Sequence, residues 1–230
     1  MSRVWIALGA AFAIGCAFGT PRSDPGEIAS GWTARDAHTL VASANPLSAV
    51  PARNADGSVN ALVEIPAGTD AKWELRKTDG ALVWEIRDGR PRVVRFLAYP
   101  ANYGMIPRTL LAVEDGGDGD PLDVLVLGPA LPRGSIVRVH PIGVLRTLDR
   151  GERDDKILSV PPDSPFADVR DVAELDAHFP GVTGIIEAWF ESYKGPGEVE
   201  TRGFGGADEA NEMLERAEQS YAIRWNRVAQ

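Results

Sequence analysis

Short apolar runs separated by turn residues dominate the chain from about residue 61 onward. Turn signals such as Pro66, Thr78-Asp79-Gly80 and Asp88-Gly89 bound these runs, which is typical of hairpins. The expected strands are 61–65, 72–77, 81–86, 93–97, 121–127, 135–139, 142–148 and 156–160. The spacing predicts a small antiparallel barrel or a strongly curved sheet at the centre of the domain.

Two helices are expected near the end of the chain. One apolar stripe, ended by Gly195-Pro196, consists of Val182, Ile185, Ile186, Trp189, Phe190 and Tyr193. A second helix, with Asp208 as its predicted N-cap, has on one face Met213, Leu214, Ala217, Tyr221, Trp225 and Val228. The 3.6-residue period predicts that both helices pack on the barrel, which gives an α+β, mainly β, fold class.

The first sixteen residues form a segment with its own pattern. Arg3 precedes an uninterrupted apolar run over residues 4–14, and Gly15-Cys16 follows. The run is too short for a permanent membrane helix and is typical of an export signal. Ala13-Ile14-Gly15-Cys16 is similar to a bacterial lipobox, so we expect residues 1–16 to be a lipoprotein-type signal peptide that leaves a lipid on Cys16. A cleaved soluble signal, or an uncleaved start and a cytoplasmic protein, are the alternatives.

Residues 17–60 are rich in small and polar residues and show no sustained period, which predicts a flexible tether. We therefore expect one domain, over residues 61–230. The 230-residue chain has a net charge of −9 without a basic stripe, which argues against nucleic acid as a partner. Its single cysteine excludes a disulfide framework.

The densest acidic motif is Asp118-Gly119-Asp120-Pro121-Leu122-Asp123. Carboxylates held a few ångströms apart repel each other, and a divalent cation offsets that repulsion. All-oxygen ligation favours Mg²⁺, Mn²⁺ or Ca²⁺ over zinc. Taken alone, the motif is also compatible with a surface turn that binds nothing.

Other polar clusters interrupt the apolar pattern of their elements. A strand period places Lys72 and Glu74 on one face, and Glu64 lies inside an apolar strand. The remaining cluster residues are Asp149, Asp154 and Lys156 around a turn, and Tyr193-Lys194 at a helix end. Taken alone, each of these clusters is also compatible with a solvent-exposed charged surface or, for Tyr193, with a core residue. Together, carboxylates for several cations and lysines for an oxyanion suit phosphoryl transfer.

Other kinds of active site find little support in the sequence. The chain has no Gly-x-Ser-x-Gly elbow and no Gly-x-x-x-x-Gly-Lys loop, and its histidines are scattered. Cys16 belongs to the signal. A covalent nucleophile and a nucleotide-binding loop of that kind are therefore not indicated.

These residues resemble the motifs of the family I (soluble) inorganic pyrophosphatases over about residues 62–194. The acidic motif fits the family's Asp-(Gly/Asn/Ser)-Asp-Pro-x-Asp signature. Val63-Glu64-Ile65-Pro66 and Tyr99-Pro100-Ala101-Asn102-Tyr103-Gly104 match two more of its motifs, in the family's order. The resemblance implies a five-stranded barrel of the oligonucleotide-binding (OB) type with peripheral helices. It also implies Mg²⁺-dependent hydrolysis of pyrophosphate to two phosphates by direct attack of a metal-activated water, with Mn²⁺ as an alternative ion.

The resemblance also implies a role for each residue. Asp120 is the expected general base, and Tyr103 lines the site near the nucleophile. The expected metal ligands are Asp118, Asp123, Asp149 and Asp154, with Glu64 and Glu74 acting mainly through water. The expected phosphate-binding residues are Lys72, Arg92, Lys156, Tyr193 and Lys194. Arg95 is the alternative to Arg92, because the spacing between Gly80 and Tyr99 differs from the short bacterial form.

Two alternatives in function stay open. One is an exported hydrolase of other polyphosphates. Another is a non-catalytic surface module that binds divalent cations. Family members are dimers or hexamers, so the resemblance suggests a homo-oligomer.

Overall fold

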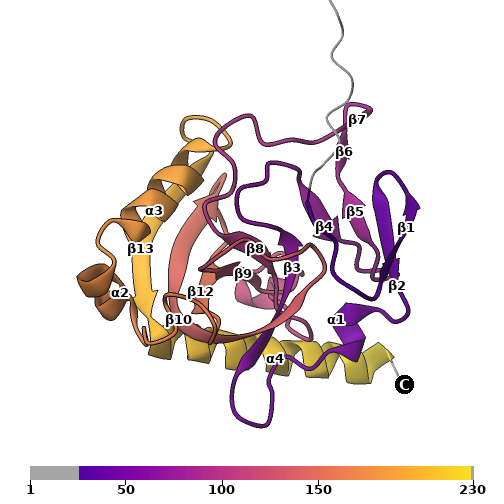
Figure 1. The fold of residues 1–230 in the computed structure, drawn as a ribbon. Helices are drawn as coiled ribbons and strands as arrows, with labels where there is room; N and C mark the ends of the chain where they lie inside the picture. The colour runs from indigo at the N-terminus through magenta and orange to yellow at the C-terminus, as the bar shows by residue number, and fades with distance from the viewer. Residues whose placement is uncertain (1–25, 229–230) are drawn as a thin grey trace, which may run out of the picture.

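The computed structural model describes residues 26–228 and centres on a barrel (Figure 1). The sheet that forms it contains β3 (Val59–Ile65), β8 (Asn102–Met105), β9 (Asp123–Val126), β10 (Ile136–Asp149), β11 (Glu152–Arg153), β12 (Lys156–Val160) and β13 (Val199–Gly206). The strand order is β11-β10-β12-β9-β8-β3, and β3 also pairs with β10. The path β10-β12-β9-β8-β3 therefore closes on itself, which confirms the predicted five-stranded barrel.

Two details of the barrel differ from the sequence-based expectation: one pair of strands is parallel, and two expected strands form a single strand. β9 and β12 run parallel, with Lys156 opposite Asp123. The expected strands 135–139 and 142–148 are one strand, β10, whose register shifts between Pro141 and Gly143. A proline lacks a backbone donor, so the irregularity lets the strand continue past it.

A second sheet lies beside the barrel and contains β1 (Trp32–Asp36), β2 (Thr39–Ala42), β4 (Trp73–Leu75) and β5 (Leu82–Trp84), in the order β1-β2-β5-β4. β4 and β5 form the hairpin predicted around Thr78-Asp79-Gly80. Trp73 and Leu75 are buried and Glu74 is exposed, as the strand period predicts.

The predicted flexible tether is wrong for residues 26–60. This segment contains β1, β2 and α1 (Pro46–Ala49), and β2 pairs with β5. Among its apolar side chains, Leu40 is buried, and Trp32 and Leu47 lie against the same cluster. The segment joins an existing sheet and does not need a core of its own. It therefore has too few apolar positions for the sequence pattern to predict its strands. Residues 1–25, with the expected signal peptide and the start of the tether, lie outside the described residues.

The expected strand 93–97 is also wrong. The chain instead forms a separate short hairpin from β6 (Ile86–Arg87) and β7 (Arg90–Pro91), which pair only with each other. Its turn places Asp88 and Gly89 at positive φ, 52° and 71°. After it, Val93 makes a single bridge to Ala71, and the chain leaves the sheet.

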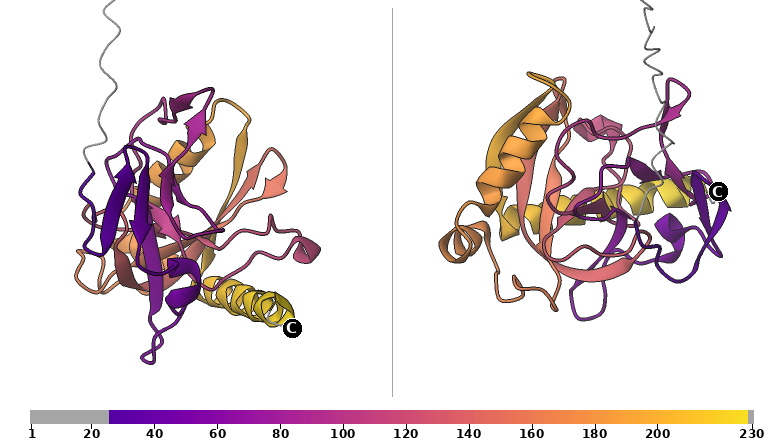
Figure 2. Two further views of the ribbon diagram at one scale, coloured as in Figure 1. Left: turned by 90° about the vertical axis from the view of Figure 1, so that its right-hand side faces the viewer. Right: turned by 45° about the horizontal axis from the view of Figure 1, so that its top comes forward.

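Three helices follow the barrel strands, α2 (Val172–His178), α3 (Val182–Ser192) and α4 (Ala207–Val228), and a single 3₁₀ turn, Val113–Asp115, precedes β9. The stripe in α3 is confirmed, since Ile186, Trp189 and Phe190 are buried. Figure 1 shows α3 at the upper left of the barrel, and the left view of Figure 2 shows α4 below the barrel. The sequence pattern missed α2, which has only one buried side chain, Leu175.

The predicted cap at Asp208 is wrong. Asp208 lies inside the first turn of α4, where a carboxylate favours the positive end of the helix dipole. The capping group is Asp171, whose Oδ2 accepts a hydrogen bond from the Ala207 N–H at 3.2 Å. Its Oδ1 accepts from the Ala173 N–H at 2.9 Å at the start of α2. One carboxylate thus fixes the beginnings of two helices.

Both faces of the barrel wall are buried. Along β9, Leu125 packs in the cluster that contains Trp189 of α3, whereas Val124 packs in the cluster that contains Met213 of α4. Alternating positions of one strand therefore serve two cores, which holds the strand ends rigidly. Between residues 26 and 228, no helix combines the length and the apolar character that a membrane span requires.

Candidate active site

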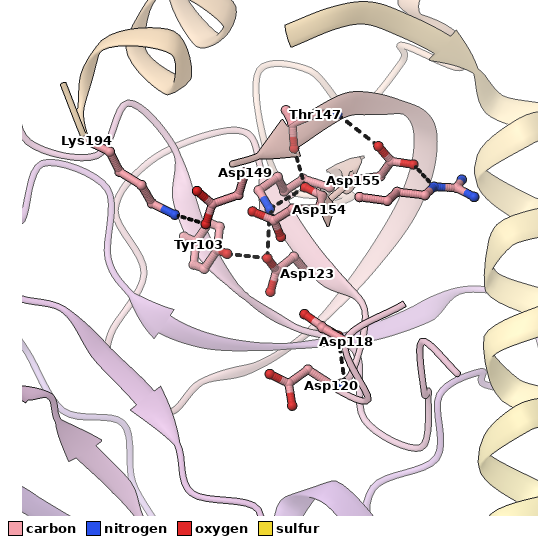
Figure 3. A network of polar contacts seen from close by, with 11 residues as sticks. Tyr103, Asp118, Asp120, Asp123, Thr147, Asp149, Asp154, Asp155 and Lys194 are labelled. Carbon is pink, nitrogen blue, oxygen red and sulfur yellow. Dashed lines mark hydrogen bonds and ion pairs between the residues drawn. The ribbon is translucent and has the colours of Figure 1, made fainter. Parts of the chain in front are cut away.

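The predicted site residues converge on a single cavity of about 630 Å³ at one end of the barrel. Its polar lining comes from segments far apart in the sequence: Glu64, Lys72, Glu74, Arg76, Lys77, Thr78, Arg92, Tyr103, Asp118, Asp120, Asp123, Asp149, Asp154, Tyr193 and Lys194. Apart from Arg95, the alternative to Arg92, every candidate site residue named from the sequence is in this set except Lys156. Lys156 lies directly behind the wall of the cavity and contacts two of its carboxylates. Figure 3 shows how the carboxylates are arranged.

The acidic motif is a turn that leads into β9. Asp118 Oδ1 accepts a hydrogen bond from the Asp120 N–H at 2.8 Å, and Gly119 between them has a φ of +80°, which glycine adopts without strain. The Asp120 carboxylate pairs with the ammonium of Lys77, from the turn between β4 and β5. Burial, followed by the charge of Asp123, raises the pKa of Asp118 above its ordinary value.

Lys156 lies at the centre of the carboxylates. Because β12 pairs in parallel with β9, Lys156 stands directly opposite Asp123, and its Nζ lies 3.0 Å from Asp123 Oδ2 and 2.5 Å from Asp154 Oδ1. Burial lowers the pKa of this ammonium, but attraction from Asp123 and Asp154 outweighs the burial and leaves the pKa above its usual value. Burial also raises the pKa of Asp154 against the opposing effect of Lys156.

Asp149 and Lys194 form the side of the cavity nearest α3. Asp149 ends β10, and its Oδ2 lies 2.5 Å from Lys194 Nζ. Its other oxygen, Oδ1, is buried and has no hydrogen-bond partner. Tyr193, at the C-terminal end of α3, stacks on Trp189 with ring centroids 4.5 Å apart. The helix end therefore presents a hydroxyl and an ammonium side by side.

Tyr103 connects the barrel to the carboxylates. Its hydroxyl donates to Asp123 Oδ2, and Lys72 Nζ lies 5.1 Å from the centroid of its ring. Burial, followed by the charges of Asp123 and Asp154, raises the pKa of Tyr103 well above its ordinary value. The phenol is therefore a stable donor that remains protonated at neutral pH.

Glu64 is the most deeply buried carboxyl of the cavity, with 5% of its surface exposed. Its Oε1 accepts the Leu75 N–H at 2.7 Å. Desolvation raises its pKa to about 7, against the lowering effect of Lys72. Glu74, by contrast, is exposed at the rim.

Of the two candidate arginines, Arg92 lines the cavity and Arg95 does not appear in its lining. Arg92 Nη1 lies 2.6 Å from Glu85 Oε2, which holds the guanidinium in place. Burial lowers the pKa of Arg92, but its pairing with Glu85 outweighs this and raises it.

The donor set fits divalent cations. In the part of the chain that the structure describes, no three acidic, histidine or cysteine side chains already enclose a metal position, because lysine ammonium groups lie between the carboxylates. The chemistry of the donors is nevertheless all carboxylate, and Asp149 Oδ1 is a buried acceptor without a donor. Such an oxygen is costly unless a cation or a donor reaches it. The site therefore suits a hard cation such as Mg²⁺ or Mn²⁺.

Sequence reasoning missed two groups that hold the site together. Asn102 is fully buried, and its side-chain oxygen accepts from the N–H groups of Ala67 and Leu131 at 3.1 and 2.8 Å. Its amide nitrogen donates to the carbonyls of Val126 and Pro129 at 3.1 and 2.9 Å. One side chain thus joins the segments that follow β3 and β9. A polar residue in an otherwise apolar strand was the available signal.

The second group fixes the turn that carries Asp149 and Asp154. Asp155 is buried, accepts the Thr147 N–H at 2.9 Å and pairs with Arg153 at 2.5 Å (Figure 3). The Thr147 hydroxyl donates to the Asp154 carbonyl. These bonds hold the backbone on both sides of the turn, so Asp149 and Asp154 face the same cavity.

Comparison with known proteins agrees with this geometry. The family model described as inorganic pyrophosphatase matches residues 61–222. The inorganic pyrophosphatase of Gluconobacter oxydans is 41% identical over 150 residues, which is 63% of this chain and 78% of that protein. The chain belongs to the inorganic pyrophosphatase family. The Xanthomonas axonopodis inorganic pyrophosphatase is 36% identical over 177 residues, covering 74% of this chain and 92% of that protein.

Solved structures extend the likeness to the fold of this pyrophosphatase. The inorganic pyrophosphatase of Helicobacter pylori superposes with a TM-score of 0.64 at 33% identity, over 76% of this chain and 99% of that chain. The vacuolar soluble pyrophosphatase of Trypanosoma cruzi, at 19% identity, shares the fold with a TM-score of 0.79 over 97% of this chain and 68% of that chain.

Proposed function

We propose that this pyrophosphatase hydrolyses inorganic pyrophosphate to two phosphates with Mg²⁺ as its cofactor, and that Mn²⁺ can replace Mg²⁺. One observation carries the proposal: carboxylates and lysines from distant parts of the chain line the same cavity. The carboxylates supply ligands for cations, and the lysines, arginine and tyrosine supply donors for phosphate oxygens. Relatives named inorganic pyrophosphatase support the assignment.

Asp118, Asp123, Asp149 and Asp154 are the residues that would hold the cations. Glu64, deeply buried in the wall, and Glu74, at the exposed rim, would act through water. When bound, the cations neutralise charge on the phosphates and lower the pKa of a water molecule. The raised pKa values of Asp118 and Asp154, and the unpaired oxygen of Asp149, all indicate carboxylates that gain from a cation.

Asp120 is the group that would accept the proton of the attacking water. The water oxygen forms a bond to one phosphorus while the bridging P–O bond breaks, and the bridging oxygen leaves on the second phosphate. Lys77 pairs with Asp120 and so fixes the position of its carboxylate at the cavity. Tyr103 holds Asp123 by a hydrogen bond and so orients a second carboxylate at the same place.

The cationic wall would bind the phosphates. Lys156 and Lys194 both contact carboxylates at 2.5 Å, and Lys72 and Arg92 line the same cavity. Charge-assisted bonds from such groups stabilise the negative charge that develops on the leaving phosphate. Tyr193 adds a hydroxyl donor from the end of α3.

Phosphate release from pyrophosphate, measured with Mg²⁺ and with a chelator, tests the function. We expect rapid release with Mg²⁺, and a loss of at least a hundredfold in kcat for Asp123→Asn and Asp120→Asn. Asp56→Asn, at an exposed carboxylate far from the cavity, is the matched control and keeps full activity. Intact, folded protein that releases no phosphate contradicts the proposal, and a panel of longer polyphosphates defines the substrate range.

We also propose that the protein is exported and anchored by a lipid on Cys16. The support is the sequence of residues 1–16, in which an apolar run ends at Gly15-Cys16. Labelling with radioactive palmitate in a bacterial host tests this. We expect label in the wild type and none in Cys16→Ser, and equal label in the two proteins refutes the anchor.

A further inference from the structure

Residues 86–97, which we call the arginine ridge, form a basic surface on an acidic protein. Arg87, Arg90, Arg92 and Arg95 line a hollow of about 470 Å³, with Asp88 as the only acidic residue in its lining. The whole chain has a net charge of −9. The ridge therefore has the opposite sign to the rest of the molecule.

The arginines of the ridge differ in what they contact. Arg92 is held by Glu85 and faces the active-site cavity. Arg87, Arg90 and Arg95 make no ion pair with any residue between 26 and 228. Arg87 and Arg90 stand directly opposite each other across the β6–β7 pair. Like charges directly opposite each other destabilise a hairpin, so the interaction between these two side chains does not stabilise the fold.

Large apolar side chains accompany these charges. Ile86 is 52% exposed, Phe96 45% and Leu97 70%. Single exposed apolar residues are normal on a protein surface, but here they flank the unpaired arginines within twelve residues of sequence. The ridge thus combines cationic groups with apolar groups that water surrounds.

The ridge also projects from the body of the molecule. β6 and β7 form their own two-stranded sheet, and the turn at Asp88-Gly89 ends it. In Figure 1, β6 and β7 stand at the top, and the chain after β7 runs along the upper edge toward α3. A hairpin that stands apart from the barrel sheet can reach an extended surface without bringing the rest of the molecule against it.

We propose that the arginine ridge docks on the surface of an anionic lipid bilayer. Arginines attract anionic headgroups, while Ile86, Phe96 and Leu97 enter the boundary between headgroups and acyl chains. A free polyphosphate explains the charges but not the apolar side chains. Because the remainder of the protein is acidic and is repelled by an anionic bilayer, the arginine ridge is the face expected to contact the bilayer. The inference does not depend on the proposed lipid at Cys16.

Vesicle sedimentation tests the ridge in the full chain carrying Cys16→Ser, so that no lipid anchor contributes. Binding is compared on phosphatidylcholine vesicles and on vesicles with added phosphatidylglycerol. Each arginine near an anionic surface is worth about a fivefold change in binding, so Arg87→Gln with Arg90→Gln is expected to reduce the anionic-lipid-dependent binding about 25-fold. The matched control, Arg138→Gln with Arg202→Gln, removes two exposed arginines elsewhere and leaves this binding within about twofold of the parent protein. Pyrophosphate hydrolysis is expected to be unchanged in both pairs, which separates this test from that of the proposed function.

Hydrogen exchange and the apolar variant locate the contact. Backbone amides of residues 86–97 are expected to exchange more slowly with anionic vesicles present, and Phe96→Ser with Leu97→Ser is expected to weaken binding without changing its salt dependence. Equal losses in the ridge pair and the control pair overturn the proposal. So does a concentration-dependent dimer that the apolar pair abolishes, which would make the ridge a contact between copies of the chain. A loss of tripolyphosphate affinity in Arg87→Gln with Arg90→Gln, with vesicle binding intact, would assign the ridge to a soluble anion instead.

Discussion

Replacing Glu64 with glutamine removes a buried carboxyl without changing its shape. Glu64 is 5% exposed and accepts the Leu75 N–H at 2.7 Å, a bond that a glutamine oxygen can also accept. Desolvation raises its pKa from 4.5 to about 7. In the absence of divalent cations, the fold therefore opposes ionisation of this group.

The sign of the effect follows from proton binding. Between pH 4.5 and about 7 the folded protein keeps a proton on Glu64 that the unfolded chain releases, so the free energy of unfolding falls as the pH rises through this window. At about 1.36 kcal/mol per pKa unit, a rise from 4.5 to about 7 corresponds to about 3 kcal/mol. Above pH 7, the free energy of unfolding is lowered by the full cost of ionising Glu64 in the folded protein.

Urea unfolding with a chelator, at a series of pH values from 5 to 8, measures this contribution. We expect Glu64→Gln and the wild type to have similar free energies of unfolding near pH 5. At pH 8 the variant is expected to be more stable, by up to about 3 kcal/mol. Parallel stability curves for the two proteins across the whole range would refute the reasoning.

Three further predictions follow from buried polar groups. Asn102→Ala removes hydrogen bonds to two N–H and two C=O groups, so we expect a loss of about 4 kcal/mol in urea unfolding; a loss below about 1 kcal/mol contradicts the assigned network. Lys156→Met leaves Asp123 and Asp154 without their shared cation, so stability with a chelator falls by about 3 to 5 kcal/mol and Mg²⁺ restores part of it; a drop that Mg²⁺ does not affect counts against this account. Asp171→Ala uncaps α2 and α4 together and costs about 2 kcal/mol by thermal unfolding, whereas an unchanged melting temperature excludes the double cap.

The barrel was predictable because its strands have clear boundaries. The segments ending at Pro66 and starting at Lys156 appear as strands in the structure, and the stripe of α3 lies where its period places it. The two early strands β1 and β2 were not predictable, because only Trp32 and Leu40 among their residues pack against the core. Such strands depend on the edge of a sheet that other residues build.

The candidate site was predictable in its membership but not in its contacts. The acidic motif and the scattered lysines indicated the chemistry, and the cavity brings them together. That Lys156 lies between two carboxylates follows from the parallel pairing of β12 with β9, which the apolar pattern does not specify. The contact between Lys77 and Asp120 joins two turns, and turn-to-turn contacts leave no periodic signal in a sequence.

Binding of Mn²⁺ without substrate tests the central claim, that carboxylates from distant segments form one cation site. The free Mn²⁺ signal in electron paramagnetic resonance reports how much ion the protein binds. We predict saturable binding in the wild type, a loss of affinity of about tenfold or more in Asp123→Asn and in Asp154→Asn, and no change in Asp56→Asn. Binding that is absent, or that these substitutions at the cavity leave unaltered, contradicts the account.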